Sequence, residues 1–143
     1  MKAYFDTSVL VAVVVDQLPQ HERALDVFAN FCESKHEAFC STHCLAECYS
    51  TLTALPLARR IQPHEAWQII EETFTRNLTV LALNRTLYLK TLKRASQLGL
   101  RSGVIYDALH LACAEHSKCD QLYTFNLRDF KKLNPEGLSL VSP

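Results

Sequence analysis

Four acidic side chains lie where local sequence makes an ionised carboxylate costly unless something pairs with it. They are Asp6, Glu47, Asp107 and Asp129. Asp6 follows the apolar segment 3–5, and Asp107 comes directly before the mostly apolar segment 108–113. A divalent cation bound by several of these carboxylates would remove that cost. Because the candidate ligands are oxygen atoms, the sequence predicts a hard cation, Mg²⁺ or Mn²⁺.

Carboxylates that share a divalent metal are suited to hydrolysis of phosphodiester bonds. A metal-bound water loses its proton more readily, and the metal also offsets negative charge on a phosphoryl oxygen. Without the metal the carboxylates would repel one another, which raises at least one pKa. The residue types therefore favour a metal-assisted attack of water on phosphorus.

Each acidic residue also has a purely structural interpretation. Asp6 and Asp107 could cap the helices that follow them, since aspartate is a preferred N-cap residue. Glu47 could be a solvated residue on the polar face of its helix. Asp129 could cap or salt-bridge within its own turn. None of these interpretations accounts for all four residues together.

The pattern of apolar residues predicts short strands that alternate with helices. The predicted strands cover 2–5, 37–40, 78–83, 121–124 and 138–141. The predicted helices cover 8–15, 21–32, 41–55, 63–74, 85–98 and 105–116, with a turn or one helical turn at 126–130. In the helix over 63–74, the spacing predicts that Trp67 faces the core. This alternation predicts an α/β fold with a parallel sheet of four or five strands and helices on both faces.

In parallel sheets of this kind, ligands bind at the carboxyl ends of the strands. Asp6 follows the first predicted strand, and Asn126 and Asp129 follow the fourth. We therefore expect these residues, although far apart in sequence, to lie at the same edge of the sheet.

Length and composition limit the class of protein. The 143 residues suit one domain, 1–143, and the formal net charge of zero excludes a polybasic tail but not a local basic patch. The longest apolar stretch, 9–15, is far shorter than the ~20 residues that cross a bilayer. We expect a cytoplasmic protein without a membrane segment.

The six cysteines and six histidines offer a second kind of metal chemistry. Cys40, Cys44 and Cys48 are spaced by four residues and lie near His43, which raises the question of zinc. No second cysteine pair completes a structural zinc site, so buried reduced thiols are the favoured interpretation. We interpret His43, with the other scattered histidines, as a surface or hydrogen-bonded group. His110 lies one turn after Asp107 and could face the same cleft.

Four segments of the chain, in order, resemble a PIN domain. They are Tyr4–Leu10 (YFDTSVL), Leu45–Cys48 (LAEC), Tyr106–Ala112 (YDALHLA) and Leu122–Phe130 (LYTFNLRDF). Each motif is short, but the ordered set covers nearly the whole chain. The resemblance implies a PIN-like three-layer α/β/α fold and Mg²⁺- or Mn²⁺-dependent endoribonuclease activity.

The resemblance also implies roles for individual residues. Asp6, Glu47, Asp107 and Asp129 form the expected catalytic set, and the expected metal ligands are Asp6, Asp107, Glu47 and Asn126. Ser8 and Thr124 are expected to donate hydrogen bonds to these ligands. Asn126 is a departure, because many relatives carry aspartate there, and it puts a two-metal mechanism in doubt. Arg128 and Lys131 are the basic residues closest to this site in sequence, so we expect them to contact the RNA backbone.

At this size the resemblance implies a VapC-type toxin of a type II toxin–antitoxin pair. The expected partners are RNA, a small cognate antitoxin and a second copy of the chain, which would form a homodimer through the early helices. The apolar set Leu25, Phe28 and Phe31 and the corner Leu55-Pro56-Leu57 have two interpretations, as part of such an interface or as part of the core. The alternative is a non-catalytic PIN-like module that binds RNA or protein, for which the neutral Asn126 is the motivation.

Overall fold

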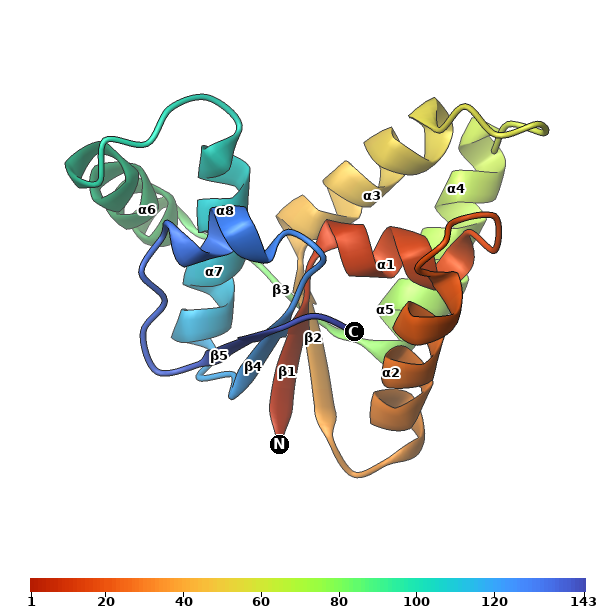
Figure 1. Cartoon of the computed structure of the whole chain (residues 1–143), viewed down its shortest axis with the longest axis horizontal. Helices are drawn as coiled ribbons and strands as arrows, with labels where there is room; N and C mark the ends of the chain where they lie inside the picture. The colour runs from red at the N-terminus through yellow and green to blue at the C-terminus, as the bar shows by residue number, and fades with distance from the viewer.

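A five-stranded, all-parallel sheet forms the centre of the computed structural model, which describes residues 1–143. The strands are β1 (Lys2–Phe5), β2 (Glu37–Ser41), β3 (Thr79–Leu81), β4 (Gln121–Tyr123) and β5 (Ser139–Val141). Their order across the sheet is β3-β2-β1-β4-β5, so the first strand is central (Figure 1). The predicted parallel sheet of four or five short strands is confirmed.

Helices cover both faces of this sheet. They are α1 (Thr7–Val14), α2 (His21–Glu33), α3 (Thr42–Ala54), α4 (Pro63–Ile69), α5 (Thr75–Asn77), α6 (Arg85–Gln97), α7 (Val104–His116) and α8 (Leu127–Lys131), with a π-helical turn η1 (Ile70–Phe74) between α4 and α5. Figure 1 shows α6, α7 and α8 on one side of the sheet and α1 to α5 on the other. The predicted three-layer α/β/α arrangement is therefore confirmed.

The central strand β1 divides the core into two parts. Ala3 and Phe5 pack into the larger apolar cluster, which includes residues of α1, α2 and α3. Tyr4 points to the other face and packs into the cluster formed with α7 and Leu122. Successive side chains of a strand point to opposite faces, so three consecutive buried residues serve both layers. The strand ends where Asp6 begins the polar edge.

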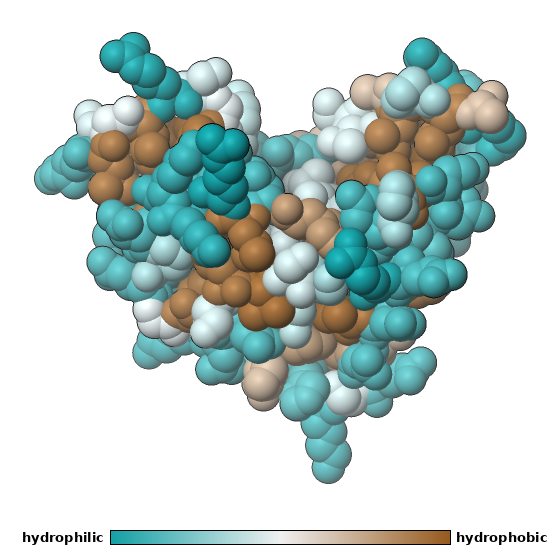
Figure 2. All heavy atoms as spheres, viewed as in Figure 1, coloured by the Kyte–Doolittle hydropathy of each residue, from teal (hydrophilic) through white to brown (hydrophobic).

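The register of β1 against its neighbours brings distant segments to one edge. Phe5 is paired with Tyr123, and the Asp6 N–H donates to the Tyr123 carbonyl at 3.1 Å. Asp6 then caps α1 by accepting a hydrogen bond from the Val9 N–H, while Ser41 caps α3 in the same way. Figure 2 shows the molecule hollowed between its two sides, above this edge of the sheet.

Two details of the helices differ from the sequence predictions. The helix predicted over 63–74 becomes α4 followed by the π-helical turn η1, which buries Ile70 and Phe74. The prediction that Trp67 faces the core is wrong, because its side chain is 57% exposed. Asp107 does not cap its helix, since α7 begins at Val104.

The remaining sequence predictions concern cysteines and membranes. All six cysteines are free thiols, and five of them, all except Cys32, are buried. Cys40, Cys44 and Cys48 lie in the larger core cluster. None of the helices combines the length and apolar character needed to cross a membrane.

Candidate metal centre

Polar side chains from four parts of the chain line one pocket of about 390 Å³. Its polar wall consists of Asp6, Thr7, Ser8, Glu47, Thr51, Asp107, His110 and Asn126, and its apolar wall of Val11, Leu18 and Leu55. The four metal ligands predicted from the sequence are therefore all in this pocket. A second cavity, of about 300 Å³ between α6 and α7, contains none of them.

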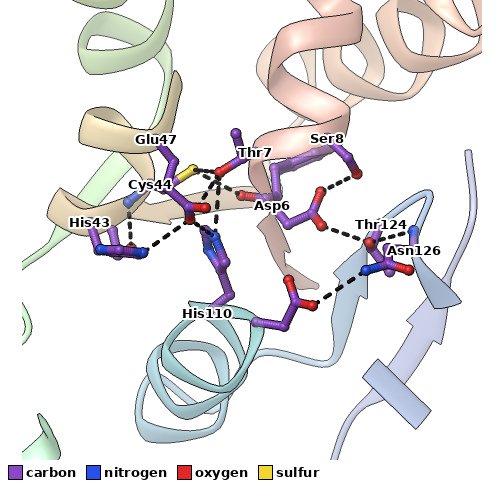
Figure 3. Close-up of polar contacts among 12 residues, drawn as sticks. Asp6, Thr7, Ser8, His43, Cys44, Glu47, His110, Thr124 and Asn126 are labelled. Carbon is purple, nitrogen blue, oxygen red and sulfur yellow. Dashed lines mark hydrogen bonds and ion pairs between the residues drawn. The ribbon is translucent and has the colours of Figure 1, made fainter. Parts of the chain in front are cut away.

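Asp6 is the most firmly held carboxylate of the pocket. Thr124 Oγ1 donates to its Oδ2 at 2.6 Å, Ser8 Oγ donates to its Oδ1 at 2.7 Å, and the Val9 N–H also donates to Oδ1, at 3.1 Å (Figure 3). Burial raises the pKa of Asp6 above its usual range, while the nearby His110 and the hydroxyl donors act in the opposite direction. Ser8 and Thr124 were expected to donate hydrogen bonds to the metal ligands, and both donate to Asp6.

Asp107 projects into the same pocket from the first turn of α7. Burial, together with the negative charges of Asp6, Asp129 and Glu47, raises its pKa to about 6, despite the opposing charge of His110. These carboxylates repel one another because little positive charge lies between them. A bound divalent cation would offset that repulsion.

Asn126 acts as a hydrogen-bond bridge between two carboxylates. Its Nδ2 donates to Asp129 at 2.9 Å and to Asp107 at 3.3 Å. Asp129 also contacts Lys132, at 3.4 Å, and it does not line the pocket. The hydrogen bond from Asn126, followed by the Lys132 contact, holds the pKa of Asp129 below its usual range. An aspartate at position 126 would repel both carboxylates, whereas the amide links them and leaves its carbonyl oxygen for a cation.

Glu47 reaches the pocket from α3, and its carboxylate contacts imidazole groups. Its Oε1 lies 2.5 Å from His110 Nε2 and 3.1 Å from His43 Nε2, and the Thr7 hydroxyl donates to it at 3.4 Å. Burial alone would raise the pKa of Glu47, but the hydrogen bond and charge of His110 lower it below its usual range. Glu47 in turn has a larger effect on His110. Burial would lower the pKa of His110, yet Glu47 and other negative neighbours raise it to about 9.

The interpretation of His43 as an ordinary surface or hydrogen-bonded histidine is wrong. Its side chain is only 15% exposed, and it lies against Glu47 and His110. The signal in the sequence was the four-residue spacing of His43 and Glu47, which places both on one face of α3. The corresponding signal for His110 was its three-residue spacing from Asp107.

The residues present fit a hard divalent cation. Asp6, Asp107 and the Asn126 carbonyl would supply oxygen ligands on one side of the pocket, and Glu47 lies on the other. The carboxylates of Asp6, Asp107 and Glu47 do not all lie within 4.8 Å of one another, so a bound ion would keep several waters. Arg128 and Lys131 are exposed on α8, which follows Asn126 directly.

The chain matches the PIN domain family over residues 3–134, which is most of its length. It therefore belongs to the PIN domain family. The resemblance drawn from the four sequence motifs is confirmed by this match.

Known relatives agree with this assignment. Ribonuclease VapC27 from Mycobacterium tuberculosis is 35% identical over 112 residues, which cover 78% of this chain and 76% of that protein. The crystal structure of VapC20 from Mycobacterium tuberculosis, a sarcin-ricin loop cleaving toxin, matches with a TM-score of 0.75 at 17% identity, over 95% of this chain and 98% of that one. VapBC2 from Rickettsia felis, bound to a promoter DNA fragment, matches with a TM-score of 0.69 at 18% identity, over 100% and 99% of the two chains. At these low identities the structures show the shared fold.

Proposed function

We propose that this protein is an Mg²⁺- or Mn²⁺-dependent endoribonuclease that hydrolyses RNA phosphodiester bonds at the pocket of Asp6, Asp107, Glu47 and Asn126. The observation that carries the proposal is that Asp6, Glu47, Asp107 and Asn126, from distant parts of the chain, line one pocket, where burial and the neighbouring carboxylates raise the pKa of Asp107 to about 6. A pocket that concentrates negative charge in this way is suited to a divalent cation. The relative named Ribonuclease VapC27 supports RNA as the substrate.

The residues of the chain have distinct tasks in this mechanism. When bound, the divalent ion would acidify a water and offset charge on the phosphoryl oxygen. Asp6 would hold the ion in a fixed position, since Thr124 and Ser8 orient both of its oxygens. Asp107 would coordinate from α7 once its proton is lost. Asn126 would contribute its carbonyl while its amide restrains Asp107 and Asp129.

RNA would approach along α8. Arg128 and Lys131 are exposed there, and cationic side chains next to an acidic pocket can hold the phosphates that flank the cleaved bond. Such contacts would position the backbone without reading its sequence. We therefore do not assign recognition of the RNA bases to Arg128 or Lys131.

We also propose that the protein acts as a toxin controlled by a small antitoxin. VapC20, which shares this fold, is a toxin, and the similar VapBC2 structure is bound to a DNA fragment from its promoter. A basic side chain of the antitoxin could enter the acidic pocket, where charge complementarity favours it. A homodimer through the early helices would use exposed residues such as Leu25, because Phe28 and Phe31 belong to the core.

The decisive experiment compares three variants in RNA cleavage. Asp6→Asn and Asp107→Asn should each reduce Mn²⁺-dependent cleavage by about 100-fold or more, since even outer partners of metal ligands are worth about 10–100-fold. Asp26→Asn, an exposed aspartate of α2, is the matched control and should retain full activity. Circular dichroism would verify that all three variants fold.

Two outcomes would overturn the proposal. Full activity in Asp6→Asn or Asp107→Asn would remove these residues from the chemistry. If the unmodified protein cleaves no RNA with Mn²⁺ or Mg²⁺ but still binds RNA or a protein partner, the chain is a non-catalytic module, which the neutral Asn126 favours.

A further inference from the structure

Two histidines and one glutamate converge at the edge of the pocket. His43 and Glu47 come from α3 and His110 comes from α7 (Figure 3). One nitrogen of each imidazole and one oxygen of the carboxylate all lie within 4.8 Å of one another. In the whole chain, this is the only group of three such side chains that is so close. We call these three residues the histidine cluster.

The contacts of His110 direct one ring nitrogen to Tyr4 and the other to Glu47. The Tyr4 hydroxyl donates to Ser41 Oγ at 2.9 Å, which leaves its oxygen, 2.8 Å from His110 Nδ1, free to accept from an Nδ1–H. A neutral His110 would then carry its lone pair on Nε2, which faces Glu47 Oε1. Two lone pairs cannot share this contact, so either a proton or a metal ion must lie between them.

The arrangement of His110 is that of a metal ligand. Metal-binding histidines usually donate their other ring N–H to an outer partner, which fixes the tautomer and the orientation of the ring. Tyr4 has this position, and it is fully buried in the core. Ser41, which accepts from Tyr4, is itself held by the Cys44 N–H at 3.1 Å.

His43 has a buried nitrogen with no hydrogen-bond partner. Its Nε2 is within 3.1 Å of Glu47 Oε1, but the geometry of the contact is not that of a hydrogen bond. The ring stacks on Tyr106, with centroids 5.4 Å apart and an interplanar angle of 17°. The ring is thus held with an unsatisfied nitrogen aimed at the other two members of the cluster. A metal ion would satisfy this nitrogen.

The donor set selects a different class of ion from the oxygen-lined side of the pocket. Two imidazoles and one glutamate form the His₂Glu set of zinc hydrolases, which leaves a fourth position for water. Mg²⁺ prefers oxygen ligands, whereas imidazole suits Zn²⁺ and similar transition metals. We propose that His43, Glu47 and His110 bind a transition-metal ion of the Zn²⁺ class, at a second position beside Asp6 and Asp107 that shares Glu47 with the oxygen-lined pocket.

This proposal goes beyond the proposed ribonuclease function and does not depend on it. It also replaces the zinc site considered for Cys40, Cys44 and Cys48. Those thiols are buried in the core, and they form no group as close as the histidine cluster.

The test is a titration of the chelator-treated, full-length protein with Co²⁺, in the presence of excess Mg²⁺ to fill the oxygen-lined pocket. Tetrahedral coordination with nitrogen ligands gives Co²⁺ strong visible absorption, and Zn²⁺ added afterwards should abolish it. One Co²⁺ per chain is the expected stoichiometry. Calorimetric titration with Zn²⁺ should give the same stoichiometry.

Variants separate the histidine cluster from other metal sites. His43→Gln and His110→Gln should each weaken Co²⁺ binding by about 100-fold, and Tyr4→Phe by about 10-fold as the loss of an outer partner. His64→Gln, an exposed histidine of α4, is the matched control and should bind as the unmodified protein does. Asp6→Asn and Asp107→Asn should also retain Co²⁺ binding, even if they abolish cleavage.

The proposal fails if the chelator-treated protein binds neither Co²⁺ nor Zn²⁺, in which case a proton alone joins His110 to Glu47. It also fails if His43→Gln and His110→Gln bind Co²⁺ unchanged. His43→Gln keeps the test valid should His110→Gln not fold, because His43 lies at the edge of the pocket rather than in the core. Loss of binding only in the Asp6→Asn variant would assign the ion to the oxygen-lined pocket and overturn the proposal.

Discussion

The two sides of the pocket hold their carboxylates in different ways. Asp6 accepts hydrogen bonds from two hydroxyl groups and a backbone N–H, all of which are neutral. Glu47 instead contacts the two imidazoles of the histidine cluster, whose charge depends on a bound proton or ion. The comparison shows that neutral donors hold the Asp6 carboxylate without any bound ion. The Glu47 carboxylate, by contrast, depends on positive charge at the neighbouring imidazoles.

The largest expected effect is a pH dependence that belongs to the Glu47 side. In the metal-free protein, folding raises the pKa of His110 from its ordinary 6.5 to about 9. This contribution is fully present below about pH 6.5 and is lost as the pH rises through about 9, with a decrease of up to about 3 kcal/mol in the free energy of unfolding. Urea unfolding in the presence of a chelator, across this pH range, would measure it.

Two variants test whether His110 causes this decrease in the free energy of unfolding. His110→Gln should show a much smaller decrease over the same pH range, whereas His64→Gln should keep the full decrease. An equal decrease in His110→Gln would mean that other groups, such as the buried thiols, cause it.

The next effect concerns the neutral donors of the Asp6 side. Thr124→Val removes the 2.6 Å hydrogen bond to Asp6, which leaves a buried carboxylate oxygen without a donor, and it also removes the 2.9 Å hydrogen bond that the Asn126 N–H donates to the Thr124 hydroxyl. We expect a loss of about 1.5–3 kcal/mol in the free energy of unfolding, the usual worth of a hydrogen bond to a charged group. Thr75→Val, at an exposed threonine bonded to a backbone carbonyl, is the control and should change stability by less than about 0.5 kcal/mol. If Thr124→Val lowers the free energy of unfolding no more than Thr75→Val does, the Asp6 carboxylate does not depend on the Thr124 hydroxyl.

A smaller effect should follow from a change in the negative charge around Asp107. Folding raises the pKa of Asp107 to about 6, so Mn²⁺ affinity should fall about tenfold per pH unit as the pH decreases below about 6. Asn126→Asp adds a carboxylate beside Asp107, so the fall should begin at a higher pH. Calorimetric titration with Mn²⁺ at several pH values would measure both curves. Superimposable curves would contradict the role given to the Asn126 amide.

The smallest effect lies outside both sides of the pocket, on α8. Arg128→Ala and Lys131→Ala should each weaken RNA binding a few-fold and reduce the slope of log affinity against log salt by about 0.7. Lys35→Ala is the control, because Lys35 is exposed shortly before β2 and therefore at the opposite edge of the sheet. An unchanged slope in both α8 variants would place the RNA elsewhere.

The Asp6 side was the more predictable from sequence because short-range rules determine it. A buried strand followed by Asp-Thr-Ser predicts the end of β1, and the carboxyl ends of parallel strands are a known place for ligands. Thr124 and Asn126 follow β4 in the same manner, so their position beside Asp6 followed from the fold class.

The histidine cluster could not be predicted in the same way. The spacing of His43 from Glu47 and of His110 from Asp107 indicates which helix face each occupies, but the two histidines meet only because α3 packs against α7, which the spacing does not predict. The position of Asp129 outside the pocket, where it contacts Asn126 and Lys132, likewise could not be predicted from the motif. Trp67 shows the same limit, because helical spacing placed it inward whereas the packing of α4 leaves it exposed.

The alternation of β1 has a consequence for how this chain can vary in length. Tyr4 supports His110 on one face of the sheet, while Phe5 packs on the other and Asp6 follows at the edge. Inserting or deleting one residue in this strand would exchange the faces and separate both proposed metal sites from the residues that support them. Related sequences should therefore gain or lose residues in exposed connections such as 99–103, and keep the spacing from Tyr4 to Asp6 unchanged.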